Sequence, residues 1–166
     1  MTGATTTTAK RVGTYTGQQS ALIALYSDDR AVRAQVRQVL GTRIAADLPD
    51  LEFEEFATPA AVIAALDQRD FDLAIFDAEA VPEGGMGLAH QIKDEMAMPL
   101  PIILLVARPA DAWLAAWSRA DEISPYPIDP IRLPQTVADV MRAEREGTVT
   151  PFTDQYDAVP GTGSRH

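Results

Sequence analysis

Two acidic segments of this sequence follow short apolar runs, a position from which side chains can do chemistry. The run Leu73–Phe76 ends on Asp77, and the run Ala21–Tyr26 is followed by the polar segment Ser27–Asp29. A run of this length suits a single strand that is buried on both faces of a sheet. The carboxyl ends of neighbouring parallel strands lie at one edge of the sheet, where binding sites form. We therefore expect Asp77 and Ser27–Asp29 to share one cleft.

Carboxylates gathered in such a cleft have two possible uses. Asp28 and Asp29 could hold Mg²⁺ together with Asp77, because this cation prefers oxygen ligands. Aspartate also caps helices without any metal, and we favour that role for the segment after the first strand. The glycine-rich segment Glu83–Gly87 could cradle a phosphate, but it contains an acid and lacks the lysine of a P-loop, which favours a plain turn.

Composition excludes several classes of function. The chain has 166 residues, with 24 acidic against 14 basic side chains and a formal net charge of -10. Nucleic acids and anionic membrane surfaces repel such a protein. Cysteine is absent, and the two histidines, His90 and His166, are too few for a histidine metal site or a catalytic triad. No apolar run reaches membrane-spanning length, so we expect a cytoplasmic protein without direct membrane insertion.

Strand-like and helical segments alternate along the chain, which predicts an α/β fold with a five-stranded parallel sheet and helices on both faces. The predicted domain covers residues 21–146, and residues 1–20 and 147–166 read as extended tails. The expected strands are Ala21–Tyr26, Leu51–Phe56 at an edge, Leu73–Phe76, Pro101–Val106 and Glu122–Tyr126. The expected helices run to about Ala46, from Pro59, from about Leu88 to Met96, from Pro109 and from Pro130.

Over residues 21–146 the chain resembles a response-regulator receiver domain of the chemotaxis-receiver (CheY-like) superfamily. The resemblance rests on the order of the elements and on four places, which are Ser27–Asp29, Asp77, the strand end at Val106 and the dipeptide Tyr126-Pro127. It implies the doubly wound, flavodoxin-like receiver fold. It also implies a cis peptide bond between Tyr126 and Pro127.

The resemblance assigns roles to the acidic residues at the strand ends. The family phosphorylates the aspartate at the place of Asp77, and it holds Mg²⁺ with two acids at the places of Ser27 and Asp28. The cation offsets the negative charges that would otherwise repel a phosphoryl group. Because Ser27 is not an acid, one anionic metal ligand of the family is missing here.

Three further family positions carry altered residues. Val106 stands where the family has the hydroxyl of Thr or Ser, and Tyr126 stands where it has a lysine before the cis-proline Pro127. Ile123 replaces the aromatic switch residue. Losing two charge-assisted hydrogen bonds, at roughly 1.5–3 kcal/mol each, would lower the stability of an acyl phosphate by a factor of hundreds. These departures predict a pseudo-receiver, in which the fold is kept and the phosphoryl chemistry is lost.

Four aromatic residues are candidates for contact with a partner. Trp113 and Trp117 are four residues apart and share a face of the helix through which receivers signal. We weigh core and interface equally for Trp113 and favour an interface for Trp117. Phe152 and Tyr156 lie in the second tail, either as anchors for a partner groove or as ordinary tail residues.

We therefore expect a protein that is not an enzyme, holds no cofactor and works by docking as an accessory or regulatory subunit of a larger assembly that pins both tails. Orphan receiver-like proteins of this kind resemble one that accompanies respiratory Complex I, the proton-pumping NADH dehydrogenase. That resemblance implies a peripheral location on a membrane complex, through protein contacts.

Two alternatives remain open at this point. The first is an active single-domain response regulator that a histidine kinase phosphorylates on Asp77, with Mg²⁺, in a two-component phosphorelay. The second is a small flavodoxin-like enzyme that binds a nucleotide or flavin at the strand tips, for which the residues offer little support.

Overall fold

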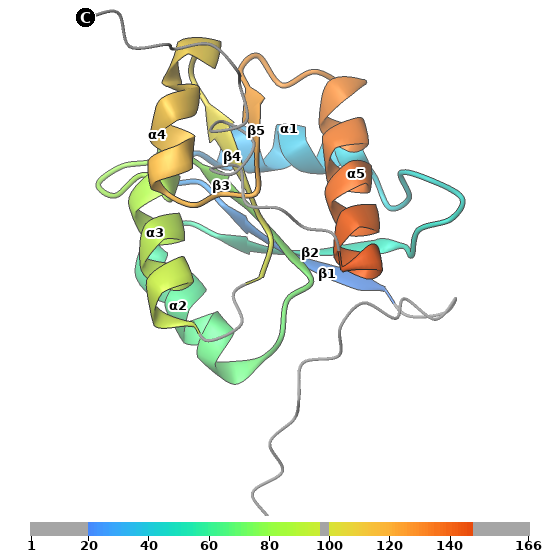
Figure 1. Cartoon of the computed structure of the whole chain (residues 1–166), viewed down its shortest axis with the longest axis horizontal. Coiled ribbons are helices and arrows are strands. Elements are labelled where there is room, and N and C mark those ends of the chain that lie inside the picture. The colour runs from blue at the N-terminus through green and yellow to red at the C-terminus, as the bar shows by residue number, and fades with distance from the viewer. Residues whose placement is uncertain (1–19, 97–99, 148–166) are drawn as a thin grey trace, which may run out of the picture.

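The computed structural model describes residues 20–96 and 100–147. Five parallel strands form one twisted sheet in the order β2-β1-β3-β4-β5 (Figure 1). The predicted five-stranded, doubly wound sheet is confirmed, and so is the edge position of the second strand. The strands are β1 (Ala21–Tyr26), β2 (Leu51–Phe56), β3 (Leu73–Asp77), β4 (Ile102–Val106) and β5 (Glu122–Pro125).

Helices cover both faces of this sheet. One face carries α1 (Arg30–Leu40) and α5 (Arg132–Glu146), and the other carries α2 (Pro59–Gln68) and α3 (Gly85–Glu95). The short helix α4 (Ala112–Trp117) follows a 3-10 turn, η1 (Pro109–Asp111), and lies against α3 and β5 (Figure 1). Within the described ranges, no helix is both long and apolar enough to cross a membrane.

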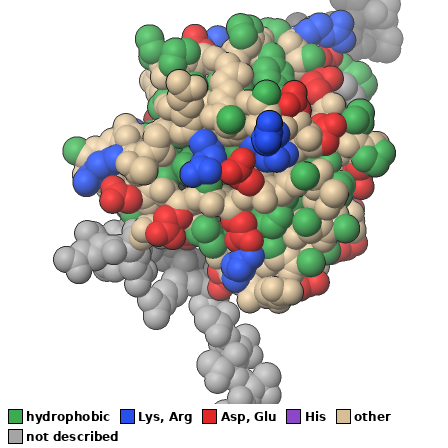
Figure 2. All heavy atoms as spheres, turned by 180° about the vertical axis from the view of Figure 1, so that it is seen from behind, with side chains coloured by type: hydrophobic (Ala, Val, Ile, Leu, Met, Phe, Trp, Pro, Cys, Tyr) green, Lys and Arg blue, Asp and Glu red, His purple; other side chains and the backbone are tan. Residues whose placement is uncertain are grey.

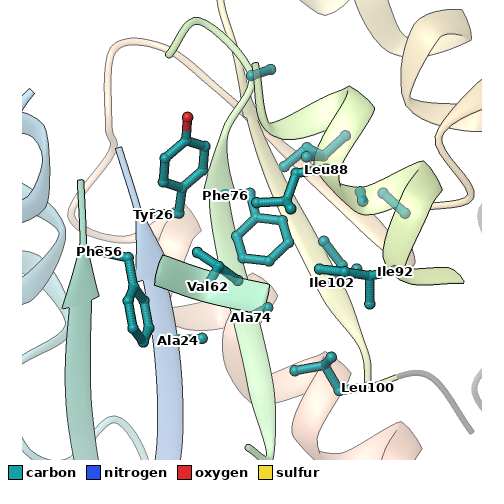
Figure 3. Close-up of a cluster of buried hydrophobic side chains, with 14 of the residues drawn as sticks. Ala24, Tyr26, Phe56, Val62, Ala74, Phe76, Leu88, Ile92, Leu100 and Ile102 are labelled. Atoms are coloured by element: carbon teal, nitrogen blue, oxygen red, sulfur yellow. The ribbon is translucent and has the colours of Figure 1, made fainter. Parts of the chain in front are cut away.

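The central strand β3 explains why its sequence is a continuous apolar run. All five of its residues are buried, because helices pack on both of its faces. On the α2–α3 side, Phe76 packs edge-to-face on Tyr26 of β1, with ring centroids 6.1 Å apart, and lies beside Leu88 of α3 (Figure 3). Each large buried side chain of this kind contributes about 1.5–3 kcal/mol to folding. The core thereby fixes the strand ends on which the candidate site stands.

Three predicted helix boundaries were wrong. The first helix ends at Leu40 and not near Ala46, because Gly41 adopts a positive φ of 59° and the carbonyl of Thr42 accepts the Leu51 N–H at 2.7 Å. The third helix begins at Gly85, three residues before the predicted Leu88.

A close backbone approach explains the early start of α3. A Cβ on Gly85 would lie 2.7 Å from the Cβ of Phe76 and 2.8 Å from the carbonyl oxygen of Asp77. Only glycine allows the loop to turn back this tightly over the end of β3. The chain can therefore enter α3 directly above the strand tip.

The last helix begins later than predicted, at Arg132, two residues after Pro130. The Asp129 carboxylate accepts the Arg132 N–H at 2.9 Å.

Candidate functional site at the strand tips

The tips of β1 and β3 bring Ser27 and Asp77 together. The two strands pair in parallel with Tyr26 opposite Phe76, so the next residue of each lies at the same edge of the sheet. The Ser27 hydroxyl donates to Oδ2 of Asp77 at 2.7 Å, and the two residues are 0% and 3% exposed. The shared cleft that the apolar runs predict is therefore present for these two residues.

Neutral donors satisfy the Asp77 carboxylate. Its second oxygen, Oδ1, accepts the backbone N–H of Glu79 at 2.9 Å. A buried carboxylate needs hydrogen bonds or a counter-charge to offset its lost hydration. Among the described residues, a serine hydroxyl and a backbone amide donate to this carboxylate, and no lysine or arginine pairs with it.

Tyr126 faces the same carboxylate from the end of β5. Burial raises the pKa of its phenol above the ordinary value, and the nearby negative charge of Asp77 raises that pKa further. The phenol nevertheless falls short of hydrogen-bond geometry: within the described part of the chain its buried hydroxyl has no partner. The predicted cis peptide bond between Tyr126 and Pro127 is confirmed, and a second one lies between Val81 and Pro82.

The two acids after Ser27 are not buried with it. Asp28 and Asp29 are both exposed. Asp29 is the N-cap of α1, since its Oδ1 accepts the Ala31 N–H at 2.8 Å, and its own N–H donates to the Ser27 hydroxyl at 3.1 Å. The favoured capping role is therefore confirmed for Asp29.

The donor set at the tips does not match the magnesium site of receivers. In the ranges 20–96 and 100–147, no three acidic or histidine side chains converge as metal ligands. Ser27 supplies a hydroxyl that already donates to Asp77, and Asp28 lies in solvent. Mg²⁺ keeps several waters and takes one or two carboxylates from a protein. Because Ser27 stands at the place of the first acid, this site offers one carboxylate fewer than the receiver set.

Two other altered family positions, Val106 and Ile123, lie in β4 and β5. Val106 is the last residue of β4 and is 1% exposed, so an aliphatic side chain fills the place of the family hydroxyl. Ile123 lies half-buried in β5, against the α2–α3 core. Neither side chain can donate a hydrogen bond to a group on Asp77.

Two contacts at the site were missed by sequence reasoning. The Tyr26 hydroxyl, which Figure 3 shows turned away from the apolar cluster, donates to the carbonyl of Glu83 at 2.6 Å and holds the loop between β3 and α3. Burial, then the charges of Asp28 and Glu83, raise the pKa of Tyr26. Arg33 of α1 donates to the carbonyl of Ser27 at 2.6 Å. Arg33 lies one helical turn after the N-cap Asp29, and this spacing in the sequence could have predicted the contact.

The four interface candidates divide into two pairs. Trp113 and Trp117 of α4 are 60% and 56% exposed, so neither is a core residue. The Trp117 ring stacks on His90 of α3, with centroids 4.4 Å apart and planes 8° apart. Phe152 and Tyr156 lie outside the described residues.

The fold is that of solved receivers. The chain matches the chemotaxis response regulator CheY4 of Vibrio cholerae with a TM-score of 0.63 and 19% identity, over 74% of this chain and 99% of that one. It matches a CheY-like receiver domain protein from Methanospirillum hungatei with a TM-score of 0.61 and 19% identity, over 78% and 99%. With an aspartate at the tip of β3, this architecture is the receiver fold.

Similarity in sequence supports a closer relationship. An uncharacterized response regulatory protein of Mycobacterium tuberculosis strain H37Rv is 50% identical over 121 residues, which is 73% of this chain and 91% of that protein. The corresponding protein of strain CDC 1551 matches equally. No family model matches the chain. At this identity and coverage, the chain belongs to the response-regulator family.

Proposed function

We propose that this chain is a receiver that works by docking onto protein partners and does not form an acyl phosphate on Asp77. The observation that carries the proposal is the hydrogen bonding of Asp77. Its carboxylate is held by the Ser27 hydroxyl and the Glu79 N–H, and Tyr126 stands in the place of the family lysine.

Electrostatics supports the loss of phosphoryl chemistry. Phosphorylation would add negative charge beside the buried Asp77 and the exposed Asp28, where the described residues place no lysine to offset it. Val106 removes the hydroxyl donor as well. Charge-assisted hydrogen bonds are about twice as strong as neutral ones, so their loss weakens the phosphorylated state most. On this proposal the protein is not an enzyme and binds neither Mg²⁺ nor another cofactor.

The exposed tryptophans support a docking role. Large aromatic side chains dominate binding energy at protein interfaces, and Trp113 and Trp117 both lie in solvent on one short helix. We propose that the partner is a multi-subunit assembly, with respiratory Complex I as the candidate, and that the chain lies on its cytoplasmic side through protein contacts. An acidic surface with a net charge of -10 argues against nucleic acid as the partner.

Labelling with a small phosphodonor tests the chemistry. The wild-type chain is incubated with acetyl phosphate and millimolar Mg²⁺, and an Asp77→Asn variant is the control. We expect neither chain to gain the mass of a phosphoryl group. Mg²⁺-dependent labelling that the variant loses would contradict the proposal and establish the alternative, an active regulator in a phosphorelay, which the placement of Asp77 at the tip of β3 favours.

Co-purification tests the docking role. The full-length chain is tagged in its native host and isolated under mild conditions, beside a double variant in which Trp113 and Trp117 are alanine. We expect the wild type to bring down the subunits of one defined assembly, NADH dehydrogenase subunits if the candidate is right, and the variant to recover much less. Recovery of the wild type only as a free monomer would refute the proposal.

A further inference from the structure

The outer edge of β2 is open. Within the described part of the chain, β2 pairs only with β1 and is the last strand of the sheet. The Ala21 N–H donates to the carbonyl of Asp50 and the Ser27 N–H to that of Phe56, so even-numbered residues of β2 turn their backbone groups toward β1. The backbone groups of Phe53 and Glu55 therefore face outward.

A groove lies along this edge. It has a volume of about 980 Å³ and is lined on one side by residues of α1 and on the other by Arg69, just after α2. Phe53 lies under the guanidinium of Arg37, whose Cζ is 5.9 Å from the ring centroid. At one end the outward N–H of Leu51 is already bonded to Thr42. The open hydrogen-bonding groups thus lie along an existing hollow that spans both faces of the sheet.

The two walls of the groove carry opposite charge. On the α1 side, two lining arginines, Arg30 and Arg37, face one glutamate, Glu55. Glu55 bonds Arg37 at 2.9 Å and a third arginine of α1, Arg33, at 3.3 Å. Figure 2, which shows the molecule from behind Figure 1, has Lys and Arg side chains interleaved with Asp and Glu across this face. The α1 wall is therefore net positive.

The opposite wall is negative by one charge. Side chains alternate between the two faces of a strand, which sends Glu52 and Glu54 to the α2 side with Arg69. Arg69 forms an ion pair with Glu54, and Glu52 is exposed. A strand added at this edge would continue both faces, so its alternate side chains would meet opposite potentials.

We propose that the open edge of β2 accepts an extended segment of a partner protein as a sixth strand of the sheet. In that segment, acidic side chains face α1 and basic side chains alternate with them toward α2. The main-chain bonds come from Phe53 and Glu55, and the alternating charges set the register. The inference rests on the proposed docking function, and it places a contact at the sheet edge opposite to β5.

A second copy of this chain is the less suitable occupant. Two β2 edges that pair across a two-fold axis perpendicular to the sheet keep their α1 faces on the same side. The positive walls would then adjoin each other, as would the negative ones, and like charges across a strand pair are destabilising. A partner segment with the complementary alternation avoids this repulsion.

A matched pair of variants tests the edge directly. Glu55→Pro removes the outward N–H and leaves the bonds to β1 in place, whereas Glu55→Ala removes the same side chain and keeps the N–H. Each tagged, full-length variant is isolated from the native host after its melting temperature has been compared with that of the wild type. We expect Glu55→Pro to recover at least tenfold less of the assembly than Glu55→Ala. Equal recovery would overturn the inference.

Hydrogen exchange on the wild type gives an answer even if Glu55→Pro folds poorly. The peptide covering β2 should gain about two protected amides in the assembly relative to the free chain. Unchanged protection of β2 in the assembly would overturn the inference. Protection of β2 in the free chain that disappears when residues 1–19 are removed would overturn it too, because the protein's own segment would then occupy the edge. Failure of the wild type to join any assembly would instead refute the docking function.

Discussion

Two aspartates are buried in the described part of the chain, and they are stabilised in different ways. Asp121, just before β5, is 6% exposed, and its Oδ2 accepts both the Lys93 ammonium and the Ile102 N–H at 2.7 Å. Asp77, at the opposite end of the sheet, is 3% exposed and is held by the Ser27 hydroxyl and a backbone N–H.

The different donors to Asp121 and Asp77 indicate which buried carboxylate the fold stabilises with a cation and which it does not. At Asp121 the lysine of α3 neutralises a carboxylate that fixes the start of β4, so the fold itself uses a buried ion pair. At Asp77 no lysine or arginine of the described residues forms an ion pair, although that is where a receiver needs a cation to hold a phosphoryl group. A carboxylate satisfied by neutral donors suits a permanent part of the scaffold.

The largest expected effect is at the ion pair. Lys93→Met leaves Asp121 buried without its cation, and loss of one partner of a buried pair costs about 3–5 kcal/mol. Urea denaturation should show this fall in the free energy of unfolding. The double variant Lys93→Met with Asp121→Asn should recover most of it, because the amide oxygen still accepts the Ile102 N–H. A single variant as stable as the wild type would show that the lysine does not neutralise Asp121.

A smaller effect is expected when an acid is restored beside Asp77. Ser27→Asp replaces a donating hydroxyl with a second carboxylate, which should lower the free energy of unfolding by about 1–3 kcal/mol in a metal chelator. Millimolar Mg²⁺ should raise the melting temperature of this variant and leave that of the wild type unchanged. An equal rise in both would mean that the wild-type tips already form a metal site.

The next prediction compares the stability lost when Tyr26 or Tyr126, both at the strand tips, is replaced by phenylalanine. Tyr26→Phe removes a hydrogen bond to Glu83 and should lower the free energy of unfolding by about 1 kcal/mol. Tyr126→Phe removes a buried hydroxyl that has no partner among the described residues, so stability should stay the same or rise slightly. Chemical denaturation of both variants measures the difference. A larger loss for Tyr126→Phe would show that its hydroxyl bonds Asp77 in solution.

The sequence predicted what depends on local pattern. Continuous apolar runs marked the buried strands, and the rule for parallel strand ends correctly placed Ser27 beside Asp77. Contacts between distant segments could not be predicted this way. The pairing of Lys93 with Asp121 joins positions 28 apart, and it depends on how α3 packs across the sheet. The open groove at β2 likewise requires the positions of α1 and Arg69.

The smallest effect is expected at a third aspartate, which has cations but lies in solvent. Arg142 donates to both carboxylate oxygens of Asp47 at 2.8 and 2.9 Å, and this bonding lowers the pKa of Asp47 from 3.8 to about 2. A depressed carboxylate pKa stabilises the fold above the unfolded value, and this stabilisation is lost as the pH falls from about 4 to about 2.

The Asp47→Asn variant should therefore melt slightly below the wild type at pH 6, and the gap should close as the pH approaches 2. Added salt should narrow it at pH 6 as well, since exposed pairs are screened. Melting temperatures of both chains across this range provide the measurement. The difference in melting temperature between Asp47→Asn and the wild type could persist at pH 2, or it could equal the decrease caused by Lys93→Met. Either result would show that burial is not what separates a strong aspartate ion pair from a weak one in this fold.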